Sequence, residues 1–231
     1  MAGAAFRDAQ SAALLTISLL PDGAAFNVLC FGDVHDELFP AAKPKTAATA
    51  AAAASFLSGL RPVWGSTELW RPLRCFELLP APTGAPRAVI LLSDGLPADP
   101  ARALQIAARA RGTRLFVLGV GPTPARHFLR SLARVSGGAA EILDSSRKSR
   151  WRSVVQQQLD RAAQPCLTSV AVSWQQFDSN APPPVQAPRR IAAVFNGSRL
   201  VVYGFVPHCT QATLTAEVSI RSLTFRSIHF L

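Results

Sequence analysis

The 231-residue sequence lacks several features that would assign a function directly. Its four cysteines are widely spaced and form no Cys-x-x-Cys pair, which argues against a structural zinc site. No apolar run reaches the roughly 20 residues that a transmembrane helix needs. There is also no P-loop and no Gly-x-Ser-x-Gly elbow, and the four histidines are scattered. Because no nucleophile with a base and no complete metal centre is evident, we expect a protein that is not an enzyme.

Acidic residues are scarce: 14 aspartates and glutamates stand against 24 lysines and arginines, for a net charge of +10. Much of the excess lies between residues 102 and 161. One interpretation is a surface that binds nucleic acid or another anion. Its candidate anion-binding residues are Arg109, Arg111, Arg126, Arg130, Arg147 and Arg150. The other interpretation is a set of solvated helix faces; no aromatic residues interleave with the arginines as in single-strand binders, so nucleic acid is not the expected partner.

The N-terminal segment shares some features with a targeting signal. Ala12–Leu20 is apolar and follows Arg7, as in a signal peptide, but Asp8 interrupts the pattern. The apolar residues also fall on one face of a helix. Together with the isolated thiols, this favours an intracellular protein.

Strand and helix patterns alternate as far as residue 163. Buried strands are predicted at Phe26–Phe31, Ala88–Leu92, Arg114–Val120 and Ala139–Leu143. Helices are predicted at Phe6–Leu20 and Thr46–Leu60, in a segment through Leu79, after Asp99-Pro100, after Thr123-Pro124, and at Ser145–Ala162. This order predicts an α/β fold with a doubly wound, mostly parallel sheet and helices on both faces.

The carboxyl ends of parallel strands are where such sheets bind ligands. Thr67 and Asp94 are the polar residues best placed at that edge. Gly119-x-Gly121 lacks the third glycine of a dinucleotide fingerprint, so close packing of a strand against a loop explains it better.

The pattern changes after Pro165, where helical periodicity stops. Strands are predicted at Val170–Trp174, Leu200–Val206, Leu214–Ile220 and Leu223–Phe230. We therefore predict two domains: an α/β domain over residues 1–163, and a small β-rich unit over 164–231 that is cut short at Leu231.

Several local phrases, in this order, resemble those of a von Willebrand factor A domain. In the α/β part they are Phe26–Gly32, Gly65–Leu69, Leu91–Gly95 and Val117–Gly121. In one subfamily, an inter-alpha-trypsin-inhibitor-type (VIT) domain precedes the A domain and a β-rich extension follows it. This extension is resembled by two segments of the sequence, Val172–Trp174 and Val194–Gly204. Within the subfamily, the resemblance is to the von Willebrand factor A domain-containing protein 5B type in particular. The resemblance implies a non-enzymatic module for protein–protein interaction; it does not identify the partner or the oligomeric state.

The family that the sequence resembles has a functional site called a metal-ion-dependent adhesion site. This site binds Mg²⁺ through an Asp-x-Ser-x-Ser loop, a threonine and a later aspartate. By the resemblance, Thr67 and Asp94 match the last two. Asp-x-Ser-x-Ser does not occur in the sequence, and Asp144-Ser145-Ser146, the nearest imitation, has the wrong spacing. The resemblance also places the start of the chain just after that loop, so that the sheet would lack its first strand.

Two oxygen donors do not define a tight Mg²⁺ site, because Mg²⁺ requires octahedral oxygen coordination. We therefore expect an incomplete adhesion site and no cofactor, unless another chain supplies the missing loop. The alternative role for Thr67 and Asp94 is to cap their loops.

Overall fold

The computed structural model describes residues 3–32, 35–61, 68–79, 87–110, 112–178, 180–218 and 228–230. The chain divides into two compact units. The first is Met1–Ala163 together with Arg221–Leu231, and the second is Gln164–Ile220.

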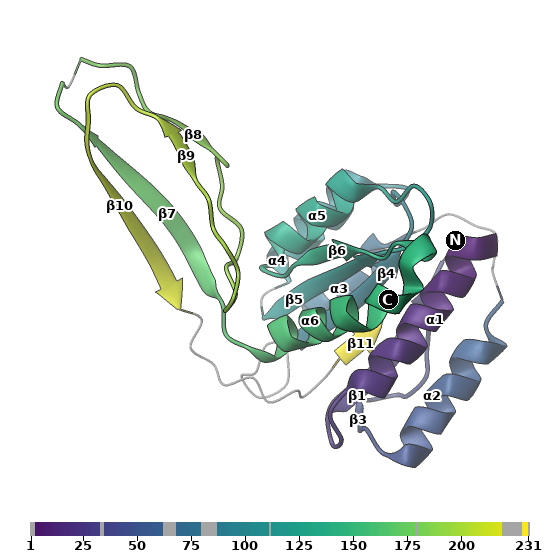
Figure 1. Cartoon of the computed structure of the whole chain (residues 1–231). Coiled ribbons are helices and arrows are strands. Elements are labelled where there is room, and N and C mark those ends of the chain that lie inside the picture. The colour runs from purple at the N-terminus through teal and green to yellow at the C-terminus, as the bar shows by residue number, and fades with distance from the viewer. Residues whose placement is uncertain are drawn as a thin grey trace. The chain divides into compact units, whose positions relative to one another are not determined.

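The first unit is built on a mostly parallel sheet (Figure 1). Its strands are β1 (Ala25–Phe31), β2 (His35–Glu37), β3 (Lys43–Pro44), β4 (Arg87–Ser93), β5 (Thr113–Gly119), β6 (Ala140–Ile142) and β11 (Ile228–Phe230). The order is β2-β1-β11-β4-β5-β6, and β3 also pairs with β1. The pairs among β1, β11, β4, β5 and β6 are parallel, whereas β2 and β3 run antiparallel to β1.

Helices cover both faces of this sheet, as predicted for a doubly wound α/β fold. In one group, α1 (Gly3–Leu19) contacts both α2 (Ala47–Gly59) and α6 (Trp151–Ala163). The other group is α3 (Trp70–Leu78), α4 (Pro100–Arg109) and α5 (Arg126–Val135). None of the helices in the described ranges is long and apolar enough to cross a membrane.

The core lies around the two central strands, because every residue of β4 and β5 is buried. Val89 and Val117 pack with Leu73, Ile106 and Leu129 of the α3–α5 group. Complete burial of one such aliphatic side chain stabilises the fold by roughly 1.5–3 kcal/mol, so these strands hold the sheet together.

Local capping explains where several helices start. The Asp99 carboxylate accepts the main-chain N–H of Arg102, as expected for the start of a helix at Asp99-Pro100. The Thr46 hydroxyl accepts the main-chain N–H of Thr49 and caps α2 in the same way. The continuous helix predicted at Ser145–Ala162 is wrong. Residues Ser145–Arg150 form a separate 3-10 segment, η2, before α6, and Arg147 within it is not helical.

The last strand corrects the sequence analysis. We predicted a strand at Leu223–Phe230 inside the β-rich unit, but β11 lies in the parallel sheet between β1 and β4. Ile228 is in register with Phe26 on one side and with Ala88 on the other. A pattern of apolar residues predicts a strand but not its partner. Pairing here satisfies main-chain groups on the facing edges of β1 and β4, so β11 lies in the gap that a sheet without its first strand would leave.

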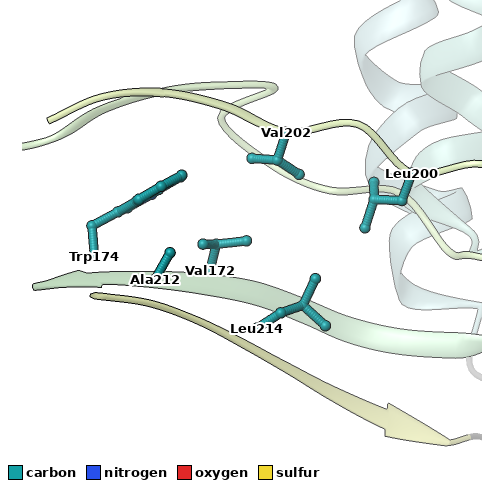
Figure 2. Close-up of a pocket in the computed structure, with 6 residues that line it drawn as sticks. All are labelled: Val172, Trp174, Leu200, Val202, Ala212 and Leu214. Carbon is teal, nitrogen blue, oxygen red and sulfur yellow. The ribbon is translucent and has the colours of Figure 1, made fainter. Parts of the chain in front are cut away.

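The second unit consists of two antiparallel ribbons. In the first ribbon, β7 (Leu167–Gln176) pairs with β10 (Cys209–Val218). In the second, β8 (Val185–Ala187) pairs with β9 (Tyr203–Phe205). Between the ribbons is an open apolar hollow of about 310 Å³ (Figure 2). It is lined by Val172, Trp174, Leu200, Val202, Ala212 and Leu214.

Candidate functional site

The turn after β4 places Asp94 at the carboxyl edge of the sheet, where it is partly exposed. Gly121, after β5, has a φ of +88°, a conformation that favours glycine. A Cβ on Gly121 would lie 3.1 Å from Cβ of Ala5 in α1 and 3.7 Å from Cβ of Asp94. The loops after two strands and the start of α1 therefore converge here, and the prediction of close strand–loop packing at Gly119-x-Gly121 is confirmed.

Two helices that begin at this edge add an aromatic and a cationic side chain. Trp70 is the first residue of α3, and the Arg102 guanidinium from the first turn of α4 stacks 3.5 Å from its ring centroid. Leu96, two residues after Asp94, is 62% exposed. The edge thus combines a carboxylate, a cation–π pair and an exposed aliphatic side chain.

The described donors at this edge do not fit Mg²⁺. Thr67 lies outside the described residues. Within the described ranges, no three His, Cys, Asp or Glu side chains come together in a way that could hold a metal ion. The hydroxyl of Ser93, the neighbour of Asp94, lies 3.5 Å from the main-chain nitrogen of Gly95 and so serves the turn. Asp94 is the carboxylate of this described set, so waters or another chain would have to supply most of the octahedral oxygen ligands of Mg²⁺.

A buried carboxylate that the sequence analysis did not select lies on α1. Asp8 is only 4% exposed; it accepts a hydrogen bond from the Ser145 hydroxyl at 2.5 Å and one from the Lys148 ammonium at 2.6 Å. Burial acts to raise the pKa of Asp8, but these hydrogen bonds and the charges of Lys148 and Arg7 outweigh it and lower the pKa. The available signal was an acid on the apolar face of a predicted helix.

The Asp144-Ser145-Ser146 sequence therefore has a structural role in this fold. Ser145 bonds to Asp8, and Ser146 donates its main-chain N–H and its hydroxyl to the Asp144 carboxylate at 2.9 and 2.6 Å. The two bonds from Ser146, with the nearby charges of Arg147 and Arg126, lower the pKa of Asp144. The hydrogen bonds of Ser145 and Ser146 thus join α1 to this segment and shape the turn at Asp144.

The five candidate arginines in the described part of the chain do not form one cluster. Arg111 lies outside the described residues. Arg109 ends α4 just before β5, whereas Arg126 begins α5 just after β5, so these two lie at opposite edges of the sheet. Arg126 and Arg130 are exposed on successive turns of α5, and Arg147 and Arg150 are exposed on η2. Arg147 forms a 3.8 Å ion pair with Asp144, which offsets part of its charge.

A doubly wound parallel sheet with a carboxylate after a central strand defines a Rossmann-like α/β binding domain. Comparison with known proteins narrows this class. The chain belongs to the von Willebrand factor type A domain family, whose model matches residues 1–142. The chain is therefore, in general class, a protein-interaction or adhesion module. The family match also confirms the resemblance noted in the sequence.

The chain is similar to short stretches of longer proteins. It is 39% identical to human protein mono-ADP-ribosyltransferase PARP4 over 94% of this chain and 12% of that protein. It is 27% identical to human von Willebrand factor A domain-containing protein 5B1 over 89% of this chain and 17% of that protein. The chain therefore spans a small part of the curated relatives it matches.

Solved structures support the fold. A von Willebrand factor type A protein from Catenulispora acidiphila matches with a TM-score of 0.58 and 20% identity, over 92% of this chain and 51% of that one. An aerotolerance-related membrane protein from Bacteroides fragilis matches with a TM-score of 0.55 and 14% identity, over 67% of this chain and 88% of that one. At these identities the likeness shows the fold alone.

One expectation from the sequence is overturned by these comparisons. We predicted a protein that is not an enzyme, yet the human and mouse relatives at 39% and 38% identity are named as mono-ADP-ribosyltransferases. That prediction was based on the absence of catalytic motifs from these 231 residues. Such an absence says nothing about the remainder of the longer proteins, of which this sequence resembles a part.

Proposed function

We propose that the chain binds a protein partner through the carboxyl edge of its sheet, and that Thr67 and Asp94 are the remainder of an incomplete metal-ion-dependent adhesion site. The observation that carries this proposal is the exposed Leu96 beside Asp94, at the edge where the Arg102–Trp70 pair also lies. Ligands of open parallel sheets bind at this edge, which makes it the first surface to test.

The chemistry of the edge suits a protein surface with an acidic group. Tryptophan and arginine are over-represented among the residues that dominate interface energetics, and an exposed leucine adds apolar area. Arg102 is exposed on one side of the Trp70 ring and would pair with a carboxylate of the partner. Without an Asp-x-Ser-x-Ser loop, contact would depend on these side chains rather than on a bound Mg²⁺.

We also propose that this binding serves a protein of the mono-ADP-ribosyltransferase kind. The support is the 39% identity over 94% of this chain to a protein of that name. The module would hold a partner near a catalytic region encoded elsewhere. Mass spectrometry of the captured partner tests this: ADP-ribose on that partner in cells that contain the full-length protein agrees, and persistent absence of the modification contradicts it.

The interaction is tested with two leucines of matched exposure at opposite edges. Leu96 is 62% exposed, and Leu79 is 64% exposed near the start of β4, where its carbonyl oxygen accepts a hydrogen bond from Arg87. A photo-crosslinking residue is placed at each position in turn. We expect Leu96 to capture a distinct partner that Leu79 does not, and Arg102→Glu to abolish that capture. Equal capture from both positions would refute the proposal.

A second candidate function is binding to an anionic surface. The observation in its favour is that Arg126 and Arg130 are exposed on one side of α5 and form no ion pair with any residue in the described ranges. Binding of this type weakens steeply as salt is added. A filter-binding assay at increasing salt tests this candidate function. We expect the double variant Arg126→Ala/Arg130→Ala to lose retention and the control Arg109→Ala, at the opposite edge of the sheet, to keep it. Absence of salt-sensitive retention by the parent chain would rule this function out.

A further inference from the structure

The β8/β9 ribbon of the second unit has an inner face defined by Trp174. The Trp174 indole Nε1 donates a 2.8 Å hydrogen bond to the side-chain oxygen of Gln186 in β8. A Cβ on Gly204 of β9 would lie 2.6 Å from ring carbons of Trp174, so the ring packs directly on the glycine backbone. Leu200 and Val202, which precede Gly204 at alternate positions, point into the apolar hollow on the same side (Figure 2).

The outer face of the same ribbon presents aromatic residues to solvent. Because side chains alternate along a strand, Tyr203 and Phe205 point away from Trp174. Tyr203 is 72% exposed and Phe205 is 75% exposed. Val185, the register partner of Phe205, is 65% exposed and completes this face. Positions two apart on a strand are separated by about 7 Å, so the two rings form adjacent platforms.

Three exposed arginines flank the strands of this aromatic face in the sequence. Arg189 and Arg190 follow β8, whose last residue, Ala187, is in register with Tyr203. Arg199 precedes Tyr203 by four residues in the other arm of the ribbon. None of the three forms an ion pair with any residue that the structure describes, so their charges are available to an external anion.

We propose that the outer face of the β8/β9 ribbon binds single-stranded nucleic acid, with bases stacked on Tyr203 and Phe205 and phosphates held by Arg189, Arg190 and Arg199. Aromatic side chains on a sheet face, next to positive charge, are the elements by which proteins hold unpaired bases. Charge complementarity favours this ligand, because an aromatic face with three unpaired arginines matches a polyanion that carries exposed π-faces. This surface belongs to the second unit, whereas the carboxyl edge proposed above for protein binding belongs to the first.

The test uses the full 231-residue chain and fluorescence anisotropy with labelled oligonucleotides of about ten nucleotides. The arms are oligouridylate RNA, oligothymidylate DNA and a duplex of the same length. We expect binding to either or both single strands, and weaker binding to the duplex, whose bases cannot stack on the rings. With three phosphate contacts, affinity should fall with salt at a log–log slope of about −2.

Variants locate the binding. Tyr203→Ala and Phe205→Ala should each weaken binding about tenfold or more, while Phe205→Tyr retains it because a stacking ring remains. Phe177→Ala is the matched control, since Phe177 is an aromatic residue of the same unit that is 87% exposed and directly follows β7. All of these side chains are exposed, so the thermal midpoint should stay unchanged.

Several outcomes would overturn the proposal. They are undetectable binding to both single strands, duplex binding as tight as single-strand binding, and full binding by the Tyr203→Ala/Phe205→Ala double variant. Sedimentation equilibrium tests the alternative that a second copy of the chain binds to this face. If the chain forms a dimer that the double variant abolishes, and the oligonucleotides do not compete with that dimer, the face is a protein interface instead.

Discussion

The Asp8 carboxylate and the Lys148 ammonium lie 2.6 Å apart, although 140 residues separate them in the sequence. Asp8 belongs to α1 and Lys148 to η2, so this pair joins the first helix to the segment that follows β6. The Ser145 hydroxyl donates to the second oxygen of the same carboxylate. The pair holds the start of α1, which also contacts Gly121 through Ala5, at the carboxyl edge of the sheet.

Removal of the Asp8 charge should destabilise the first unit. Asp8→Asn weakens two hydrogen bonds to a buried group, and we expect a loss of about 1–3 kcal/mol, less than for a fully buried pair because Lys148 is half exposed. Urea denaturation measures the free energy of unfolding. Asp22→Asn is the control, because Asp22 is 94% exposed in its ion pair with Lys45 and should cost under about 1 kcal/mol. Equal effects of the two variants would show that the Asp8 cluster adds nothing special.

The same pair makes a contribution to stability that depends on pH. The pKa of Asp8 is lowered in the folded chain from its ordinary value of 3.8. A carboxylate with a depressed folded-state pKa contributes stability above its unfolded pKa, and this is lost as pH falls through the folded pKa. The gap in unfolding free energy between the parent chain and Asp8→Asn should be full near pH 6 and shrink below pH 4 (about the ordinary pKa). A gap that grows on acidification would reverse the sign and refute the assignment.

Gly138 is a position where the backbone leaves no room for a side chain. A methyl group there would overlap the main-chain carbonyl oxygen of Leu115 in β5, and backbone cannot rotate away as a side chain can. We expect Gly138→Ala to cost more than about 2 kcal/mol. Gly95→Ala is the matched control, because its Cβ would meet no atom within 4 Å. Thermal denaturation of both variants decides; a Gly138→Ala chain as stable as Gly95→Ala would contradict the packing.

The position of β11 predicts a local pattern of amide protection. A chain that ends at residue 227 loses the strand that pairs with Phe26–Val28 and Ala88–Ile90. Hydrogen exchange should then accelerate at amides of those two segments, because they lose ladder partners. The β5 residues Leu115–Val117 pair with β4 and provide the internal reference. Unchanged exchange in β1 and β4 after the truncation would show that β11 does not occupy this place.

The sequence predicted the features that depend on neighbouring residues. The cap at Asp99 is a local hydrogen bond, and the apolar runs of β4 and β5 are typical of strands buried on both faces. Contacts between distant segments were not predictable in this way. The Arg102–Trp70 stack joins two helices, and the position of β11 depends on pairing across the chain rather than on its own residues.

The break between η2 and α6 has a similar origin. Residues 145–162 have a helical pattern of apolar residues, and a continuous helix was the natural prediction. In the structure, Asp144 captures the main-chain N–H of Ser146, while Ser145 and Lys148 turn to a carboxylate on α1. Side-chain bonds of this kind compete with helical geometry, and only the folded chain shows which one prevails.

Calorimetric titration of the 231-residue chain with Mg²⁺ tests the central claim most directly, namely that this is an A-type interaction module with an incomplete adhesion site. Thr67 and Asp94 would supply two of the six octahedral oxygen ligands of Mg²⁺ and leave the rest to water, which we expect to be too few for tight binding. We predict no binding in the micromolar range and identical titrations for the parent chain and Asp94→Ala. Micromolar Mg²⁺ binding that disappears in Asp94→Ala would contradict the claim and show that this chain completes the site by itself.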